Sequence, residues 1–125
     1  MAHPNSSDYN SLVTGSYNSM VDETLIGSAV ESGPAFSIDT TYTDPSGTPM
    51  EYLSYYRNLL AKGYKVGPTI DHDNHNMTFG KTATSRLVIL APSLSKHNLL
   101  TSMRQRRFYA SEDCAARVTF GISNN

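Results

Sequence analysis

Apolar side chains recur at helical spacing in one part of the chain, at Tyr52, Leu53, Tyr56, Leu59 and Leu60. This spacing would place them on one face of a helix. The segment Thr48-Pro49-Met50-Glu51 supplies a start signal, because Thr suits the N-cap, Pro the first helical position and Glu the third position of a capping box. Lys62 complements the helix dipole, and Gly63 suits a left-handed C-cap. The pattern predicts a helix over 49–62.

Short apolar runs bounded by turn residues predict four strands, over 25–31, 64–69, 86–91 and 117–122. The helix lies between the first two strands, which makes one β-α-β unit with parallel pairing and indicates the α/β class. The polar stretches before and after this unit predict loops, with room for a short helical turn in residues 4–20.

A second helix is predicted over 96–107. Ser95 suits its N-cap, and Leu94 and Leu99 are placed to form a hydrophobic staple. Three arginines crowd its end, at Arg104, Arg106 and Arg107. Their positive charges complement the dipole at the C-terminal end of the helix. The alternative interpretation is that these arginines bind a phosphate group.

Composition narrows the class of protein. A length of 125 residues fits one domain, and 10 basic against 11 acidic residues disfavour a nucleic-acid groove. No apolar run approaches the roughly 20 residues that span a bilayer, and the first residues lack the pattern of a secretion signal, so as written the chain is expected in the cytoplasm. Cys114 is the single cysteine, so a metal would need His and carboxylate ligands.

The densest chemistry lies in Asp71-His72-Asp73-Asn74-His75, directly after a predicted strand. In extended backbone Asp71, Asp73 and His75 would project to one side and His72 to the other. Carboxylate and imidazole ligands at the end of a parallel strand suit Zn²⁺, Mn²⁺ or Fe²⁺. The alternative interpretation is a polar turn whose Asp and Asn side chains bond their own backbone.

Four further residues have both a functional and a structural explanation. His3 is a metal-ligand candidate or an exposed terminal side chain, and Glu31 ends a strand and either points into a site or is solvated. Arg86 opens an apolar strand, where it would meet an anion or extend to water, and Arg107 is either a phosphate ligand or a helix-end charge. No residue is identified as catalytic.

Several segments, in this order, resemble the second half of a PHP domain, the polymerase-and-histidinol-phosphatase family of metal-dependent phosphoesterases, in its CehA-like branch. They are Ala2-His3-Pro4-Asn5, Ala29–Gly33, Leu59–Val66 leading into Asp73-Asn74-His75, and Leu99–Ala110. The resemblance spans nearly the whole chain, and the order of the motifs is more specific than any one of them.

The resemblance implies the C-terminal portion of a distorted (β/α)₇ barrel with mostly parallel strands, so that residues 1–125 form a single partial domain. It implies metal ligands at His3, Asp73 and His75, with Asp71, His72 and Glu31 as outer partners or possible ligands. His72 stands where the family has Ser, and the spacing of Asp73 to His75 favours Asp73 over Asp71 as the ligand. The family's other ligand motifs would precede His3 and are absent from this sequence.

Three hypotheses follow. In the first, the chain is an incomplete or weakly active phosphoesterase that acts on small phosphate esters, with Zn, Mn or Fe partly occupying its site. In the second, it is a non-catalytic half-barrel or an oligomeric metal-binding or interaction module. In the third, it is a small binding domain unrelated to the family. A half-barrel would leave strand edges and a sheet face uncovered, so we expect a homo-oligomer or a partner that covers them.

Overall fold

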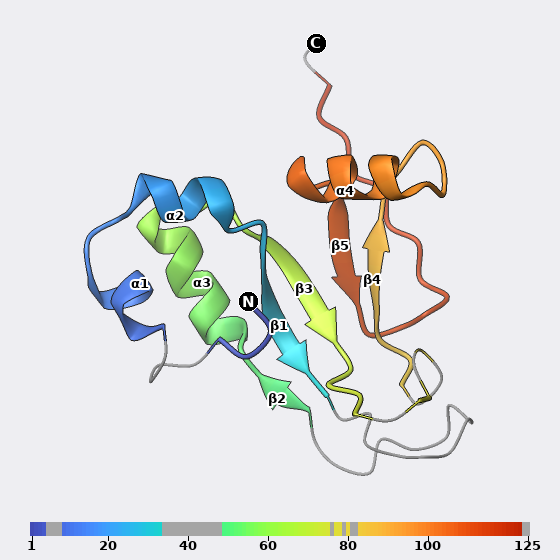
Figure 1. Cartoon of the computed structure of the whole chain (residues 1–125), viewed down its shortest axis with the longest axis horizontal. Helices are drawn as coiled ribbons and strands as arrows, with labels where there is room; N and C mark the ends of the chain where they lie inside the picture. Colours follow the sequence, from blue (N-terminus) through green and yellow to red (C-terminus); the bar gives the residue numbers. More distant parts are fainter. Residues whose placement is uncertain (5–8, 34–48, 76, 79, 81–82, 124–125) are drawn as a thin grey trace.

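The computed structural model describes residues 1–4, 9–33, 49–75, 77–78, 80 and 83–123. Its elements are, in chain order, α1 (Asn10–Thr14), α2 (Ser19–Thr24), β1 (Gly27–Ser32), β2 (Met50–Glu51), α3 (Leu53–Lys62), β3 (Gly67–Asp71), β4 (Arg86–Ile89), α4 (Lys96–Arg104) and β5 (Phe108–Ser111). Helices α1 to α3 gather on one side of the molecule, while β4, β5 and α4 lie on the other (Figure 1).

The strands form two small sheets, one of three strands in the order β2-β1-β3 and one in which β4 pairs with β5. Only β1 and β3 pair in parallel, whereas β1 with β2 and β4 with β5 are antiparallel. The expectation of a mostly parallel portion of a (β/α)₇ barrel is therefore wrong, and the described residues contain no barrel. The fold is a small mixed assembly of helices and strands.

The position of α4 explains why the second sheet is antiparallel. A parallel pair needs a crossover that returns the chain to the end where the first strand began. Helix α4 instead lies across the end of the sheet, so β5 starts where β4 finishes (Figure 1). Strand β2 likewise meets β1 in the opposite direction, with Glu51 opposite Glu31 and Met50 opposite Ser32.

The predicted β-α-β unit does form, as β1, α3 and β3. Ala29 lies opposite Thr69 and Ser32 opposite Asp71, with a register irregularity between Ala29 and Glu31. Because the strands are parallel, their carboxyl ends meet at one edge of the sheet. Ser32 and Asp71 are thereby brought side by side at that edge.

Helix α3 confirms the predicted end of the first helix and corrects its start. Gly63 takes a left-handed conformation with φ of 97°, and its N–H bonds the last turn. The helix begins at Leu53 instead of residue 49, because Met50 and Glu51 pair with β1. Thr48, the predicted capping residue, lies outside the described residues.

The C-terminal third departs further from the pattern. Ser95 caps α4 by accepting the N–H of Asn98, as predicted, but Leu94 is 93% exposed and forms no staple. The helix ends at Arg104 instead of residue 107, and a strand that the sequence did not predict begins at Phe108. Residues 117–122, predicted as a strand, have no regular structure.

A core of Tyr55, Leu59, Tyr64 and Val66 joins α3 to the segment that leads into β3. Leu59 is fully buried and Tyr64 nearly so. The strand predicted over 64–69 begins only at Gly67, because Tyr64 and Val66 belong to the segment between α3 and β3 and pack into this core. Across the described ranges, every helix is too short or too polar to cross a membrane.

Candidate functional site

The candidate site is built on the carboxyl ends of β1 and β3. The Ser32 hydroxyl donates a hydrogen bond of 2.5 Å to Asp71 Oδ1, and the Gly33 N–H donates one of 3.0 Å to the Asp71 carbonyl. These bonds join the two strands beyond their ladder. They fix the Asp71 carboxylate at the edge of the sheet, where it can receive a further donor.

That donor is the backbone N–H of Asp73, 3.1 Å from Asp71 Oδ1. Asp73 has φ of 49°, the left-handed region that Asp tolerates better than most residues. The two aspartates therefore lie together through a turn in which one side chain bonds the backbone two residues on. The extended alternation predicted for this segment does not apply, since β3 ends at Asp71.

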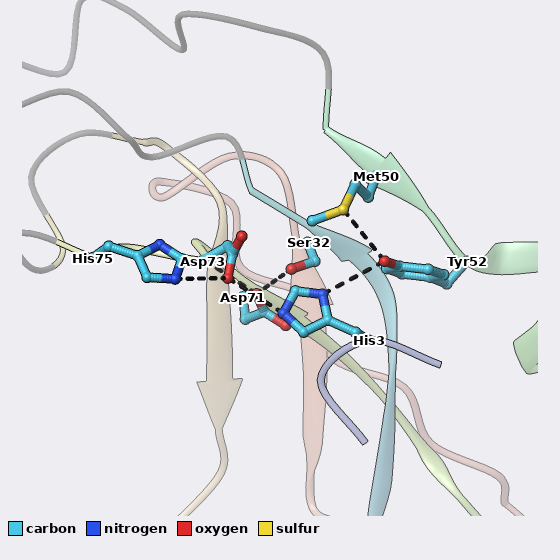
Figure 2. A network of polar contacts seen from close by, with 7 residues as sticks. All are labelled: His3, Ser32, Met50, Tyr52, Asp71, Asp73 and His75. Carbon is cyan, nitrogen blue, oxygen red and sulfur yellow. Dashed lines mark hydrogen bonds and ion pairs between the residues drawn. The ribbon is translucent and has the colours of Figure 1, made fainter. Parts of the chain in front are cut away.

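Two imidazoles face the Asp73 carboxylate. His3 Nε2 lies 3.2 Å from Asp73 Oδ1, and His75 Nε2 lies 4.0 Å from the same oxygen (Figure 2). The Asp73 side chain is 17% exposed, compared with 45% for His3 and 72% for His75. We call His3, Asp73 and His75 the His-Asp-His cluster.

The N-terminal residues bring His3 to the cluster by running beside β1. The Met1 amino group donates to the Gly27 carbonyl at 2.8 Å, and the Met1 carbonyl accepts the Ala29 N–H at 2.9 Å. The other side of the His3 ring meets Tyr52, whose hydroxyl is 3.5 Å from Nδ1 (Figure 2). Nε2 is thereby left directed at Asp73.

The donor set of the cluster suits Zn²⁺, Mn²⁺ or Fe²⁺, but its arrangement is incomplete. Ligand atoms about 2.0–2.1 Å from one cation lie about 3.0–3.4 Å from each other. The His3–Asp73 pair has that spacing, whereas His75 would have to approach Asp73. Within the residues that the structure describes, no three His, Cys, Asp or Glu side chains already have the geometry of a metal site.

The remaining candidates lie away from the cluster. His72 turns to the other side, with Nε2 2.6 Å from the Ser85 carbonyl, and Asn74 donates to the Thr78 hydroxyl at 3.0 Å. The Arg86 guanidinium donates to three loop carbonyls, those of Gly80, Ala83 and Ser85, at 2.6–2.9 Å. Arg107 is exposed and directly precedes β5, which begins far from the carboxyl ends of β1 and β3 (Figure 1).

Glu31 belongs to a different surface. It lines a cavity of about 460 Å³ together with Glu51, Glu112 and Asp113, and the apolar residues Val30 and Ile70 also line this cavity. Burial raises the pKa of Glu31, and the charges of Glu112 and Glu51 raise it further. We call these four residues the acidic cavity.

Sequence reasoning missed two members of the site, Ser32 and Tyr52. Tyr52 was counted as part of the apolar helix face, but it precedes α3 and contacts the His3 ring edge-on at 6.4 Å between centroids. Ser32 could have been found from the predicted parallel pairing, because the last residue of one strand meets the last residue of the next.

Comparison of the chain with family models, with curated proteins and with solved structures finds no match.

Proposed function

We propose that the chain binds one divalent cation, Zn²⁺, Mn²⁺ or Fe²⁺, through the His-Asp-His cluster, and that this is the remnant of a hydrolytic site for phosphate esters with little turnover of its own. One observation supports it above the others. Although His3 is far from Asp73 and His75 in the sequence, the Nε2 atoms of both histidines lie near the same carboxylate oxygen of Asp73. The motif resemblance had assigned ligand roles to the same three residues.

The chain's own residues define what the site can do. Asp73 supplies the charge, and His3 is oriented by Tyr52 on its far side. Asp71 and Ser32 support the cluster without belonging to it. Asp71 accepts a hydrogen bond from the Asp73 backbone N–H, and the Ser32 hydroxyl donates one to Asp71. Such outer partners set the orientation, and so the affinity, of the atoms that contact a metal.

A bound divalent cation would supply an acidified water and would neutralise charge on a phosphate oxygen. The cluster offers three ligands, one of which must move, and one cation cannot hold both the attacking and the leaving oxygen of a phosphate ester. The Arg86 guanidinium is occupied by loop carbonyls, so it adds little for a phosphate. We therefore expect weak metal binding and little or no phosphatase activity.

Calorimetric titration with Zn²⁺ and Mn²⁺ tests the binding. We expect one site, with a dissociation constant weaker than roughly 50 nM, which is where the weakest four-ligand structural zinc sites lie. His75→Ala and Asp73→Asn should abolish the binding heat. His97→Ala is the matched control, because His97 is exposed on α4, and it should leave the titration unchanged.

Hydrolysis of a generic phosphomonoester with added Mn²⁺ or Zn²⁺ tests the chemistry. The proposal expects turnover near the buffer blank for the native chain and for His75→Ala. Robust turnover that His75→Ala removes would show that the three ligands are sufficient for catalysis, and would overturn the proposal of a weakly active remnant. Unaltered heats in Asp73→Asn would overturn the metal site itself.

A further inference from the structure

Residues 117–123 carry the pattern of a β-strand without being one. Val118, Phe120 and Ile122 alternate with Thr119, Gly121 and Ser123, a period that puts three large apolar side chains on one side of an extended chain. These three side chains are 57%, 87% and 82% exposed. The segment leaves the body of the molecule beyond α4 (Figure 1). It resembles a strand that has no sheet to join.

Strand β4 offers the edge that such a strand would need. It pairs with β5 on one side, and in the described part of the chain no strand lies on its other side. Its residues Leu87, Val88 and Ile89 are apolar on both faces and only partly buried. Edges of this kind, apolar and without a proline or a lysine, pair readily with another strand.

The register of the β4–β5 ladder shows which backbone groups face that edge. The Leu90 N–H donates to the Arg107 carbonyl at 2.8 Å, so 90 and 107 form a hydrogen-bonded pair. In an antiparallel ladder such pairs alternate, so Val88 also pairs with β5 through hydrogen bonds. The N–H groups of Leu87 and Ile89 therefore point away from β5, at the edge.

The start of the segment is bonded to a side chain of β5 and not to the edge of β4. The Val118 N–H donates to the Tyr109 hydroxyl at 3.1 Å, and Tyr109 is the β5 residue opposite Val88. From this anchor the chain runs outward (Figure 1). A second copy can be met without breaking the anchor, and a net charge of -1 gives two copies little mutual repulsion.

We propose that two copies of this chain associate by strand exchange, with residues 117–123 of each copy added as a strand to the free edge of β4 in the other. The exchange is a two-fold, self-complementary contact, in which the same two features of both copies are used. It is a form of β-augmentation: the backbone bonds supply affinity, and the side chains of Val118, Phe120 and Ile122 supply specificity.

Sedimentation of the full chain tests the association. We expect a dimer of about 27 kDa, twice the chain mass of 13.7 kDa, at micromolar concentration. Phe120→Asp should weaken the dimer at least about a hundred-fold, because a large apolar contact is lost in both copies. Thr119→Asp is the matched control on the opposite side of the segment and should leave a dimer. Phe120 is exposed, so neither variant should alter the circular dichroism of the fold.

Hydrogen exchange then locates the contact. In the dimer, the amides of Leu87 and Ile89 should be protected, and Phe120→Asp should release them while Val88 keeps its protection. A native chain that stays monomeric at micromolar concentration would overturn the proposal. A dimer indifferent to Phe120→Asp would also overturn it, as would protection of Leu87 and Ile89 in a monomer, since the segment would then pair within its own chain.

Discussion

The two sheets meet where the Phe108 ring lies over Gly67. This contact predicts that Gly67→Ala destabilises the native chain but stabilises a chain without the Phe108 ring. A Cβ added to Gly67 would lie 2.5 Å from Phe108 Cε2 and 3.3 Å from Cε1, well inside van der Waals contact. Phe108 is 7% exposed, so its ring has little room to move aside. Overpacking of this kind costs about 1–3 kcal/mol.

Replacing Gly by Ala also removes freedom from the unfolded chain, which stabilises the fold by about 0.4–1 kcal/mol. For Gly67→Ala the overlap outweighs this gain, and we expect a net loss of up to about 2.5 kcal/mol. In a Phe108→Leu background the ring atoms that cause the overlap are gone. The same Gly67→Ala change should then stabilise the fold by about 0.4–1 kcal/mol.

The native chain, the two single variants and the double variant form a double-mutant cycle. Urea unfolding of these four proteins, followed by far-ultraviolet circular dichroism, measures the coupling energy between positions 67 and 108. The chain has no tryptophan, so circular dichroism is a better probe than intrinsic fluorescence. We expect a coupling energy of about 1–3 kcal/mol between the two positions. Equal destabilisation by Gly67→Ala in both backgrounds would refute the argument that Phe108 fills the space above Gly67.

Three further stability predictions follow from buried or partly buried groups. Burial and the charge of Glu112 raise the pKa of Glu31, so ionisation of Glu31 opposes folding. Glu31→Gln should therefore raise the melting temperature at neutral pH, and this gain should disappear below the ordinary glutamate pKa. The backbone N–H of Lys65 is the main cause of a lowered pKa at Asp22, so the stability that ionised Asp22 contributes is lost as the pH falls below the ordinary aspartate pKa. In that pH range the melting temperature of Asp22→Asn should depend less on pH than that of the native chain. Leu59→Ala should cost about 2–5 kcal/mol in urea unfolding, since Leu59 is fully buried.

Local signals in the sequence predicted the parts of the fold that local chemistry decides. Gly63 ends α3 because glycine accepts positive φ, and Ser95 starts α4 because its hydroxyl accepts a backbone N–H. The parallel pairing of β1 with β3 followed from the helix between them. Each of these depends on a few neighbouring residues or on one connection.

The parts that failed depend on contacts between distant residues. Met50 and Glu51 carry helix-start signals, yet pairing with β1 makes them a strand. Phe108 directly follows the predicted second helix, and no strand was predicted there, but its ring fits the space over Gly67, and the chain there becomes β5. Barrel closure, inferred from motif order alone, needs many such distant pairings, and the described residues do not make them.

For the site, the sequence indicated which residues gather but not how. The Asp and His residues near position 73 were expected to converge through strand alternation, whereas a left-handed Asp73 held by Asp71 places them. The approach of His3 depends on the path of the first residues beside β1, which no local pattern shows.

The most direct test of the proposed cation site is to follow the imidazole nitrogens of the four histidines by NMR during a Zn²⁺ titration. The account predicts that the Nε2 resonances of His3 and His75 shift together and saturate at one equivalent, while those of His72 and His97 stay in place. Equal shifts at His97, or no shift at His3 with His75 alone responding, would contradict a shared site on Asp73.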